Sequence, residues 1–202
     1  IIITVHCVIN NFHLKSEINQ LEKELDIIIH ENGKDGIAIL GYHGVVSEQE
    51  KKENYASNPY FMSISEFEKQ MKYLADNNYQ CLSMEDVEAY YHGKKEVSKK
   101  AVCLTFDDGY KNFNTIVKTI IKKYNLQATN FVIGYKTKTN NLLYLQTNDL
   151  KNDQYVEYYS HSYDMHHIGH LPYKKKIETM TTNEIKKDFE KNKGLVSTDY
   201  FA

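Results

Sequence analysis

The chain has 202 residues, which is enough for one domain with its own hydrophobic core. Its formal net charge is −2, and its lysines are scattered among acidic residues, so the sequence lacks the basic patch that binds nucleic acid. The three cysteines, Cys7, Cys81 and Cys103, include no CxxC pair, so they indicate neither a disulfide framework nor a cysteine-based metal site.

Residues 1–35 are expected to form an N-terminal extension. Residues 1–9 are apolar, but a bilayer requires about 18 to 20 such residues, and the run lacks the basic start and cleavage site of a secretory signal. Two interpretations stay open: the run is the end of a membrane anchor upstream of residue 1, or it is a strand. In residues 12–29, apolar side chains recur at spacings of three and four, which predicts an amphipathic helix.

Strand and helix patterns alternate from residue 37 onward. Short apolar runs predict strands at 37–43, 101–106, 128–133 and 156–160. Helical spacing of apolar residues predicts helices at 64–77, 83–91 and 116–124, and a last helix from 181 onward. The polar stretches 47–61 and 136–154 are expected to be loops. This alternation predicts an α/β fold with a mainly parallel sheet or a (β/α) barrel.

Two helix starts carry a specific signal. Ser63 and Glu66 have the spacing of a capping box, in which each side chain binds the other's backbone N–H, and Thr181 and Glu184 are expected to open the last helix. In the last helix, the apolar residues are expected on one face, and these are Ile185, Phe189 and Leu195.

Two adjacent aspartates follow the strand expected at 101–106. Asp107 and Asp108, in the run Thr-Phe-Asp-Asp-Gly, fall at the carboxyl end of that strand, where α/β folds gather their active sites. Adjacent carboxylates point in different directions, so one can bind a cation while the other accepts a proton from water. Asp-Asp-Gly is also a common turn and helix cap, and that interpretation is the better one when the run is taken alone.

A histidine pair follows the strand expected at 156–160. His161 and His166 would be separated by roughly 140° on an ideal helix, so a turn is needed to bring both rings to one ion. Imidazole and carboxylate ligands suit zinc and neighbouring transition metals. Such a group of histidines is more often a surface cluster, but a metal site becomes the better interpretation if both motifs end strands of one sheet.

Over residues 37–202 the sequence resembles the polysaccharide deacetylase family, the NodB-homology carbohydrate esterases. The Thr-Phe-Asp-Asp-Gly run is similar to the first motif of that family, and the stretch from His161 to His166 is similar to the second. The resemblance implies a distorted (β/α) barrel of the NodB-homology type. It also implies that Asp107 is the catalytic base and that Asp108, His161 and His166 bind a divalent metal. Zinc is the first expectation for this metal, with cobalt, nickel or iron as alternatives.

The second motif is longer than that of many family members, in which the second histidine comes four positions after the first; in this chain it comes five positions after. This longer form, with Asp164 and Met165 before the second histidine, looks like the branch that deacetylates poly-N-acetylglucosamine of the biofilm matrix. His167 adjoins His166 and is the alternative ligand, with His166 preferred. His43, at the end of an early strand, resembles the general acid of that branch, and a role as a hydrogen-bonded packing residue stays open.

Residues 198–202 look like the start of a strand that, in the family, leads to a Pro-Tyr-Gly motif. The resemblance therefore implies a deacetylase domain over 36–202 that is incomplete at its C-terminal end. The expected function is removal of N-acetyl groups from an amino-sugar polysaccharide, which is poly-N-acetylglucosamine, a chitin-like polymer or peptidoglycan, at the cell surface or outside the cell. Two alternatives are an inactive carbohydrate-binding protein of the same fold and a non-haem iron oxygenase, which also binds its metal with two histidines and a carboxylate.

Overall fold

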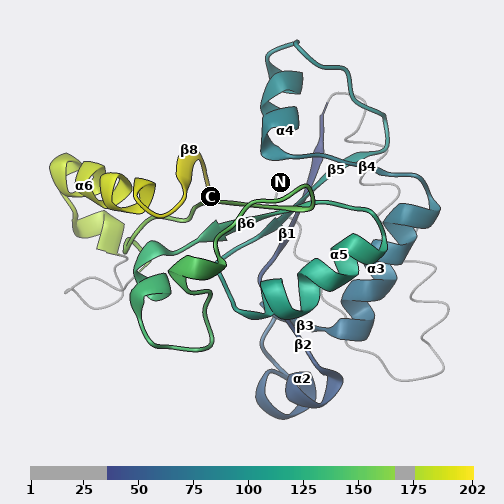
Figure 1. Cartoon of the computed structure of the whole chain (residues 1–202), viewed down its shortest axis with the longest axis horizontal. Helices are drawn as coiled ribbons and strands as arrows, with labels where there is room; N and C mark the ends of the chain where they lie inside the picture. The colour runs from purple at the N-terminus through teal and green to yellow at the C-terminus, as the bar shows by residue number, and fades with distance from the viewer. Residues whose placement is uncertain (1–35, 167–175) are drawn as a thin grey trace.

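A parallel sheet is the centre of the computed structural model, which describes residues 36–166 and 176–202 (Figure 1). The strand order in this sheet is β1-β5-β6-β7-β8, with β4 paired to the start of β5. Strands β2 and β3 form a separate parallel pair. The strands are β1 (Ala38–Tyr42), β2 (Gly44–Val46), β3 (Phe61–Ser63), β4 (Gln80–Cys81), β5 (Ala101–Phe106), β6 (Ala128–Val132), β7 (Val156–Ser160) and β8 (Ser197–Phe201).

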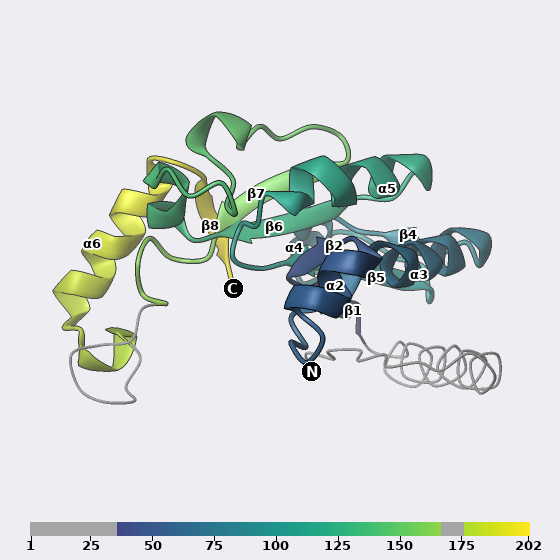
Figure 2. The ribbon, with the colours of Figure 1, turned by 90° about the horizontal axis from the view of Figure 1, so that it is seen from below.

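Helices cover both faces of the sheet and extend beyond its edges (Figures 1 and 2). Helices α3 and α5 pack on one face, and α4 packs on the other. The α-helices are α2 (Glu48–Asn54), α3 (Ile64–Asp76), α4 (Met84–Tyr91), α5 (Lys118–Lys123) and α6 (Thr182–Lys193). Shorter helical turns are the π-helical η1 (Phe113–Val117) and the 3-10 turns η2 (Gly134–Lys138), η3 (Thr147–Asp149) and η4 (Lys176–Thr179).

Strand β5 explains how one apolar run builds two hydrophobic layers. Successive side chains of a strand point to opposite faces. Val102, Leu104 and Phe106 therefore join the core under α3 and α5, whereas Ala101 and Cys103 join the smaller core under α4. All six residues of β5 are buried, as expected for a central parallel strand. Within the described residues, no helix is long and apolar enough to cross a bilayer.

The predicted α/β fold with a parallel sheet is confirmed. The predicted capping box at Ser63 is present, since its backbone N–H donates to Glu66 at 3.1 Å. The last helix also begins with a capping box, in which the N–H of Thr181 donates to Glu184 at 2.7 Å. In the described part of the chain the sheet is open, because its edge strands β1 and β8 do not pair with each other. The predictions for residues 1–35, including the domain boundary at residue 36 and the helix at 12–29, fall outside the described residues and are not tested.

The prediction of a loop over 47–61 is wrong in its first half, which forms α2. Ser47 caps this helix by accepting a hydrogen bond from the N–H of Glu50 at 3.1 Å. None of the side chains of α2 is buried, so the helix has no apolar stripe and hydrophobic spacing cannot detect it. The expected apolar face of α6 is also incomplete, because the buried side chains of this helix are Asp188 and Asn192.

Candidate metal centre

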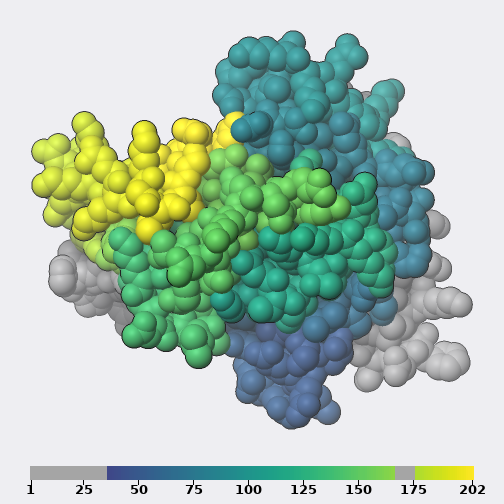
Figure 3. Space-filling view, viewed as in Figure 1, coloured from purple at the N-terminus to yellow at the C-terminus, as the bar shows by residue number. Residues whose placement is uncertain are grey.

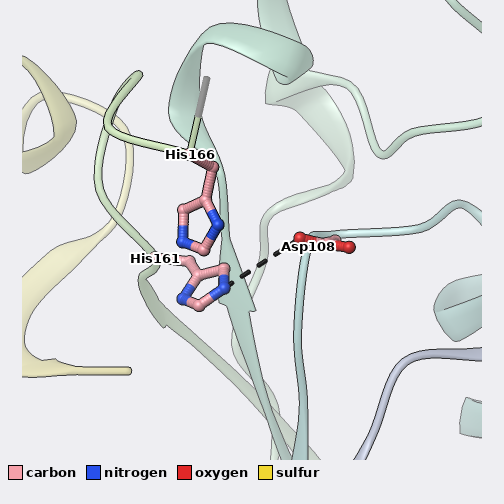
Figure 4. A group of neighbouring side chains, drawn as sticks. All are labelled: Asp108, His161 and His166. Atoms are coloured by element: carbon pink, nitrogen blue, oxygen red, sulfur yellow. Dashed lines mark ion pairs between the residues drawn. The ribbon is translucent and has the colours of Figure 1, made fainter. Parts of the chain in front are cut away.

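The parallel sheet brings the polar motifs to one edge. His43 follows β1, Asp107 and Asp108 follow β5, and His161 follows β7. Since these strands run in the same direction, their carboxyl ends lie at the same end of the sheet. Figure 4 shows the outcome: the rings of His161 and His166 lie one above the other, and Asp108 faces them from the neighbouring loop.

Asp108, His161 and His166 form the cluster that the two motifs predict. Each offers one ligand atom, and these atoms lie within 4.8 Å of one another. Nε2 of His161 is 4.0 Å from Oδ1 of Asp108, and the two imidazole centroids are 3.9 Å apart. Ligand atoms on one tetrahedral zinc ion lie about 3.4 Å apart. Small side-chain rotations would therefore bring all three donors onto one ion, and the residues fit a divalent metal.

The tautomer of His161 favours metal binding. Its Nδ1 contacts the backbone carbonyl oxygen of Ala202, which can only accept, so Nδ1 carries the proton. Nε2, which faces Asp108, is then left with a free lone pair. Burial lowers the pKa of His161 to about 4, and neighbouring His166 acts in the same direction. The ring is therefore neutral at neutral pH, which is the form that binds a metal ion.

A tight turn explains how histidines five positions apart share one site. Ser162 has a φ of 65°, in the left-handed region, and reverses the chain directly after His161. Its hydroxyl oxygen accepts a hydrogen bond from the N–H of Met165 at 3.1 Å, which closes the turn. His166 is thereby returned over the ring of His161. His167 lies outside the described residues, so the choice between His166 and His167 as ligand stays a prediction.

Asp107 lies beside the cluster and differs from Asp108 in its environment. Its backbone N–H donates to the carbonyl of Tyr42 at 2.9 Å, which ties the end of β5 to the end of β1. Burial, with a further contribution from the charge of Asp108, raises the pKa of the Asp107 carboxyl to about 7. A cation bound to Asp108 would act in the opposite direction and favour the ionised form. With a cation bound beside it, Asp107 would be ionised at neutral pH and able to accept a proton.

His43 also lies at this edge. Its ring packs against Tyr60, with 4.7 Å between the ring centroids. Burial lowers the pKa of His43, the negative charge of Asp108 opposes this shift, and His166 adds to it. The ring therefore lies close enough to the metal cluster to respond to its charges, and the role of His43 as a proton donor stays a prediction.

Tyr110 is a site residue that sequence reasoning missed. It follows the aspartate motif directly. Burial raises the pKa of its hydroxyl, and the negative charge of Asp108 and the neighbouring Tyr144 act in the same direction. The ring of Tyr144 stacks on that of Tyr110, with centroids 5.1 Å apart. Tyr144 belongs to the polar stretch 136–154. In the same stretch, the backbone N–H of Leu145 donates to the carbonyl of Gly109 at 2.9 Å. In the sequence, the position of Tyr110 next to the aspartate motif was the only signal that it belongs to the site, because Tyr144, which stacks on it, is far away in the chain.

Gly109 holds the aspartate motif in a conformation that other residues resist. Its φ is 74°, and a Cβ at this position would lie 3.0 Å from Cγ1 of Val132. We expect Gly109→Ala to destabilise the fold by about 2 kcal/mol or more, since the left-handed conformation costs about 1–2 kcal/mol and the contact adds to it. Gly93→Ala is the matched control, because Gly93 has a φ of 67° with nothing within 4 Å of its added Cβ. Urea denaturation of both variants measures the difference, and equal losses would contradict the role of the Val132 contact.

Comparison with known proteins agrees with this site. The sequence profile described as "Polysaccharide deacetylase" matches residues 94–198, which include both motifs. The Bacillus subtilis protein named "Putative polysaccharide deacetylase YxkH" is 36% identical over 98 residues, covering 48% of this chain and 32% of the relative. Poly-beta-1,6-N-acetyl-D-glucosamine N-deacetylase of Staphylococcus aureus strain MRSA252 is 28% identical over 180 residues, covering 80% of this chain and 59% of the relative. The solved structure of Streptococcus pyogenes deacetylase PplD in complex with acetate matches with a TM-score of 0.61 and 26% identity, over 82% of this chain and 72% of that one.

The chain belongs to the polysaccharide deacetylase family, because the family profile covers just over half of its length. The structural match shows that it also shares the α/β fold of a solved family member. The chain spans less than two thirds of the length of these two curated relatives.

Proposed function

We propose that this protein is a metal-dependent hydrolase that removes N-acetyl groups from an amino-sugar polysaccharide. The observation that carries the proposal is the meeting of Asp108, His161 and His166 beside Asp107 at the carboxyl edge of the sheet. The same ligand set occurs in non-haem iron oxygenases, but their double-stranded β-helix is not the parallel sheet described for this chain. Membership of the deacetylase family favours hydrolysis as well.

The proposed chemistry assigns a separate task to each group. A divalent cation held by Asp108, His161 and His166 would supply a Lewis acid for the acetamide carbonyl and lower the pKa of a water molecule. Asp107 would accept a proton from the attacking water, for which a carboxyl beside the cation is well placed. His43 would donate a proton to the nitrogen of the sugar as the carbon–nitrogen bond breaks. The products are acetate and a free amino sugar.

The role of His43 leads to a testable expectation. We expect His43→Gln to lower kcat by about 10²-fold or more while the bound metal is retained, because general acids typically contribute 10² to 10⁴ in rate. Tyr60→Phe is the matched control, since it keeps an aromatic ring beside residue 43. Turnover and metal content measured on the same samples decide the matter. Unchanged kcat in His43→Gln would leave only a packing role for this residue.

Poly-β-1,6-N-acetylglucosamine is the substrate that we propose first. The curated relative that aligns with 80% of this chain carries that polymer in its name. Chitin-like chains and peptidoglycan contain the same acetamido group and are the alternatives to be compared. A polymer of this kind is found outside the cytoplasm, so we also propose that the protein acts at the cell surface or outside the cell. For the metal we propose zinc, which suits imidazole and carboxylate ligands.

Acetate release tests the proposal directly. Purified protein would be supplied with zinc and incubated with β-1,6-linked and β-1,4-linked N-acetylglucosamine oligomers and with peptidoglycan fragments. We expect acetate from the β-1,6-linked oligomers, loss of activity after treatment with a chelator, and recovery when zinc is restored. Glycan binding without acetate release, in protein shown to contain metal, would instead support an inactive carbohydrate-binding protein.

A further inference from the structure

The histidine turn is held from outside the metal site by a buried carboxylate. We propose that Asp188 of α6 is a positioning residue, which holds the turn between His161 and His166 in the shape that binds the metal. The inference rests on the proposed metal-dependent function and deepens it, because it assigns to α6 a part in building the site.

Asp188 binds the backbone of the turn through both of its oxygens. Its Oδ1 accepts the N–H of Tyr163 at 2.6 Å, and its Oδ2 accepts the N–H of Asp164 at 2.8 Å. The carboxylate belongs to a residue that is only 6% exposed. Hydrogen bonds that a buried carboxylate accepts from backbone N–H groups are stronger than those between neutral groups. The middle of the turn is thus fixed at two consecutive residues.

Asn192, one helical turn further along α6, binds the start of the same turn. Its Nδ2 donates to Oγ of Ser160 at 2.7 Å and to the carbonyl of Ser162 at 2.9 Å. Asn192 is fully buried. Because residues i and i+4 lie on the same face of a helix, Asp188 and Asn192 present one polar stripe to the histidine turn.

The segment after β6 also binds the turn. The N–H of Gly134 donates to the carbonyl of Ser162 at 3.0 Å, and that of Tyr135 donates to the carbonyl of Tyr163 at 2.9 Å. A Cβ on Gly134 would lie 2.0 Å from Oδ1 of Asn192, so α6 and this segment meet with no room for a side chain there. Figure 3 shows the yellow C-terminal part of the chain packed against the green part.

The ring of Tyr163 adds a further contact between the turn and its surroundings. Nζ of Lys191, on α6, lies 5.4 Å from the ring centroid, and Nζ of Lys138, in η2, lies 5.7 Å from it. The helix itself is anchored by the capping box at Thr181 and by its contact with β8, where the rings of Phe189 and Phe201 are 4.9 Å apart. The turn is therefore held between two anchored elements.

Removal of the Asp188 carboxylate should loosen the turn without removing a ligand. His166 then loses the fixed position that places its ring over His161. Residues that orient metal ligands from outside the ligand set typically change metal affinity by about 10- to 100-fold. We therefore expect Asp188→Asn to bind metal more weakly by this factor, because an amide can accept only one of the two N–H groups. Asp188→Ala, which accepts neither, should have the larger effect.

Cobalt(II) is the probe for this experiment, since its visible absorption reports the ligand geometry. The full chain would be titrated with cobalt at a temperature at which circular dichroism shows each variant to be folded. The matched control is Glu190→Gln, a similar change at an exposed position on the same helix. We expect a dissociation constant raised about 10- to 100-fold and a changed absorption spectrum for Asp188→Asn, and wild-type behaviour for the control. Asp188→Glu keeps a carboxylate, and we expect it to bind cobalt more tightly than Asp188→Asn does.

The outcomes separate this inference from the proposed function. If the wild type binds cobalt, and Asp188→Asn shows the same dissociation constant and the same spectrum, the role of Asp188 is overturned and the proposed metal site is left intact. Failure of the wild type to bind cobalt would contradict the proposed function, and the inference with it. If Asp188→Ala does not fold, Asp188→Asn alone decides, because it keeps the size and shape of the side chain.

Discussion

Replacement of Asp107 by Asn should lower kcat by about 10² to 10⁴ while metal content stays at the wild-type level. The amide has the shape of the carboxyl but cannot accept a proton from water. The backbone hydrogen bond from residue 107 to the carbonyl of Tyr42 does not involve the side chain, so the end of β5 should keep its place. Acetate release and bound zinc, measured on the same preparation, test this expectation.

Two results would contradict the assignment of Asp107. Full activity in Asp107→Asn would show that another group accepts the proton. Loss of metal together with activity would show that Asp107 is a ligand, and the division of tasks between the two adjacent aspartates would then be wrong. Asp76→Asn, at an exposed position on α3, serves as the control for a simple loss of charge.

Replacement of Asp108 by Asn should remove metal binding more completely than any substitution outside the ligand set. We expect the affinity for zinc to fall by more than the factor of about 10 to 100 that is typical of residues supporting the ligands. Asn is the informative substitution because Asp108 has a φ of 73°, a conformation that Asn tolerates and Ala does not. A folded variant that has lost its metal can therefore be attributed to the carboxylate and not to the backbone.

Competition with a chromophoric chelator measures this affinity, and thermal unfolding without metal checks the fold. We expect Asp108→Asn and the wild type to unfold at similar temperatures when both are free of metal. A variant that keeps wild-type affinity would exclude Asp108 as a ligand and reduce the site to a pair of histidines.

Two features of the sequence predicted the metal cluster: its members are next to strand ends, and the two motifs resemble those of the polysaccharide deacetylase family. Asp108 follows an uninterrupted apolar strand, and His161 follows a second strand of the same sheet. In a parallel sheet this placement brings the residues to the same edge, without knowledge of any side-chain contact. The turn that returns His166 to His161 was required by the spacing, and Ser162 provides it.

The supporting residues could not be predicted in the same way. Asp188 and Asn192 are polar residues on a helix whose apolar spacing suggested a different buried face. Their burial is favourable only because the backbone groups of the histidine turn form hydrogen bonds with them. The spacing of hydrophobic residues in a sequence does not indicate which polar residues have such partners. Helix α2 escaped prediction for a related reason, since its side chains are not buried and it has no apolar stripe.

The most direct test of the metal centre is an anomalous-difference map from crystals of the protein grown with zinc. We predict one strong peak, about 2.0–2.2 Å from a carboxylate oxygen of Asp108, from Nε2 of His161 and from a ring nitrogen of His166. A peak at another place, or none among these three side chains in crystals that contain zinc, would contradict the proposed site.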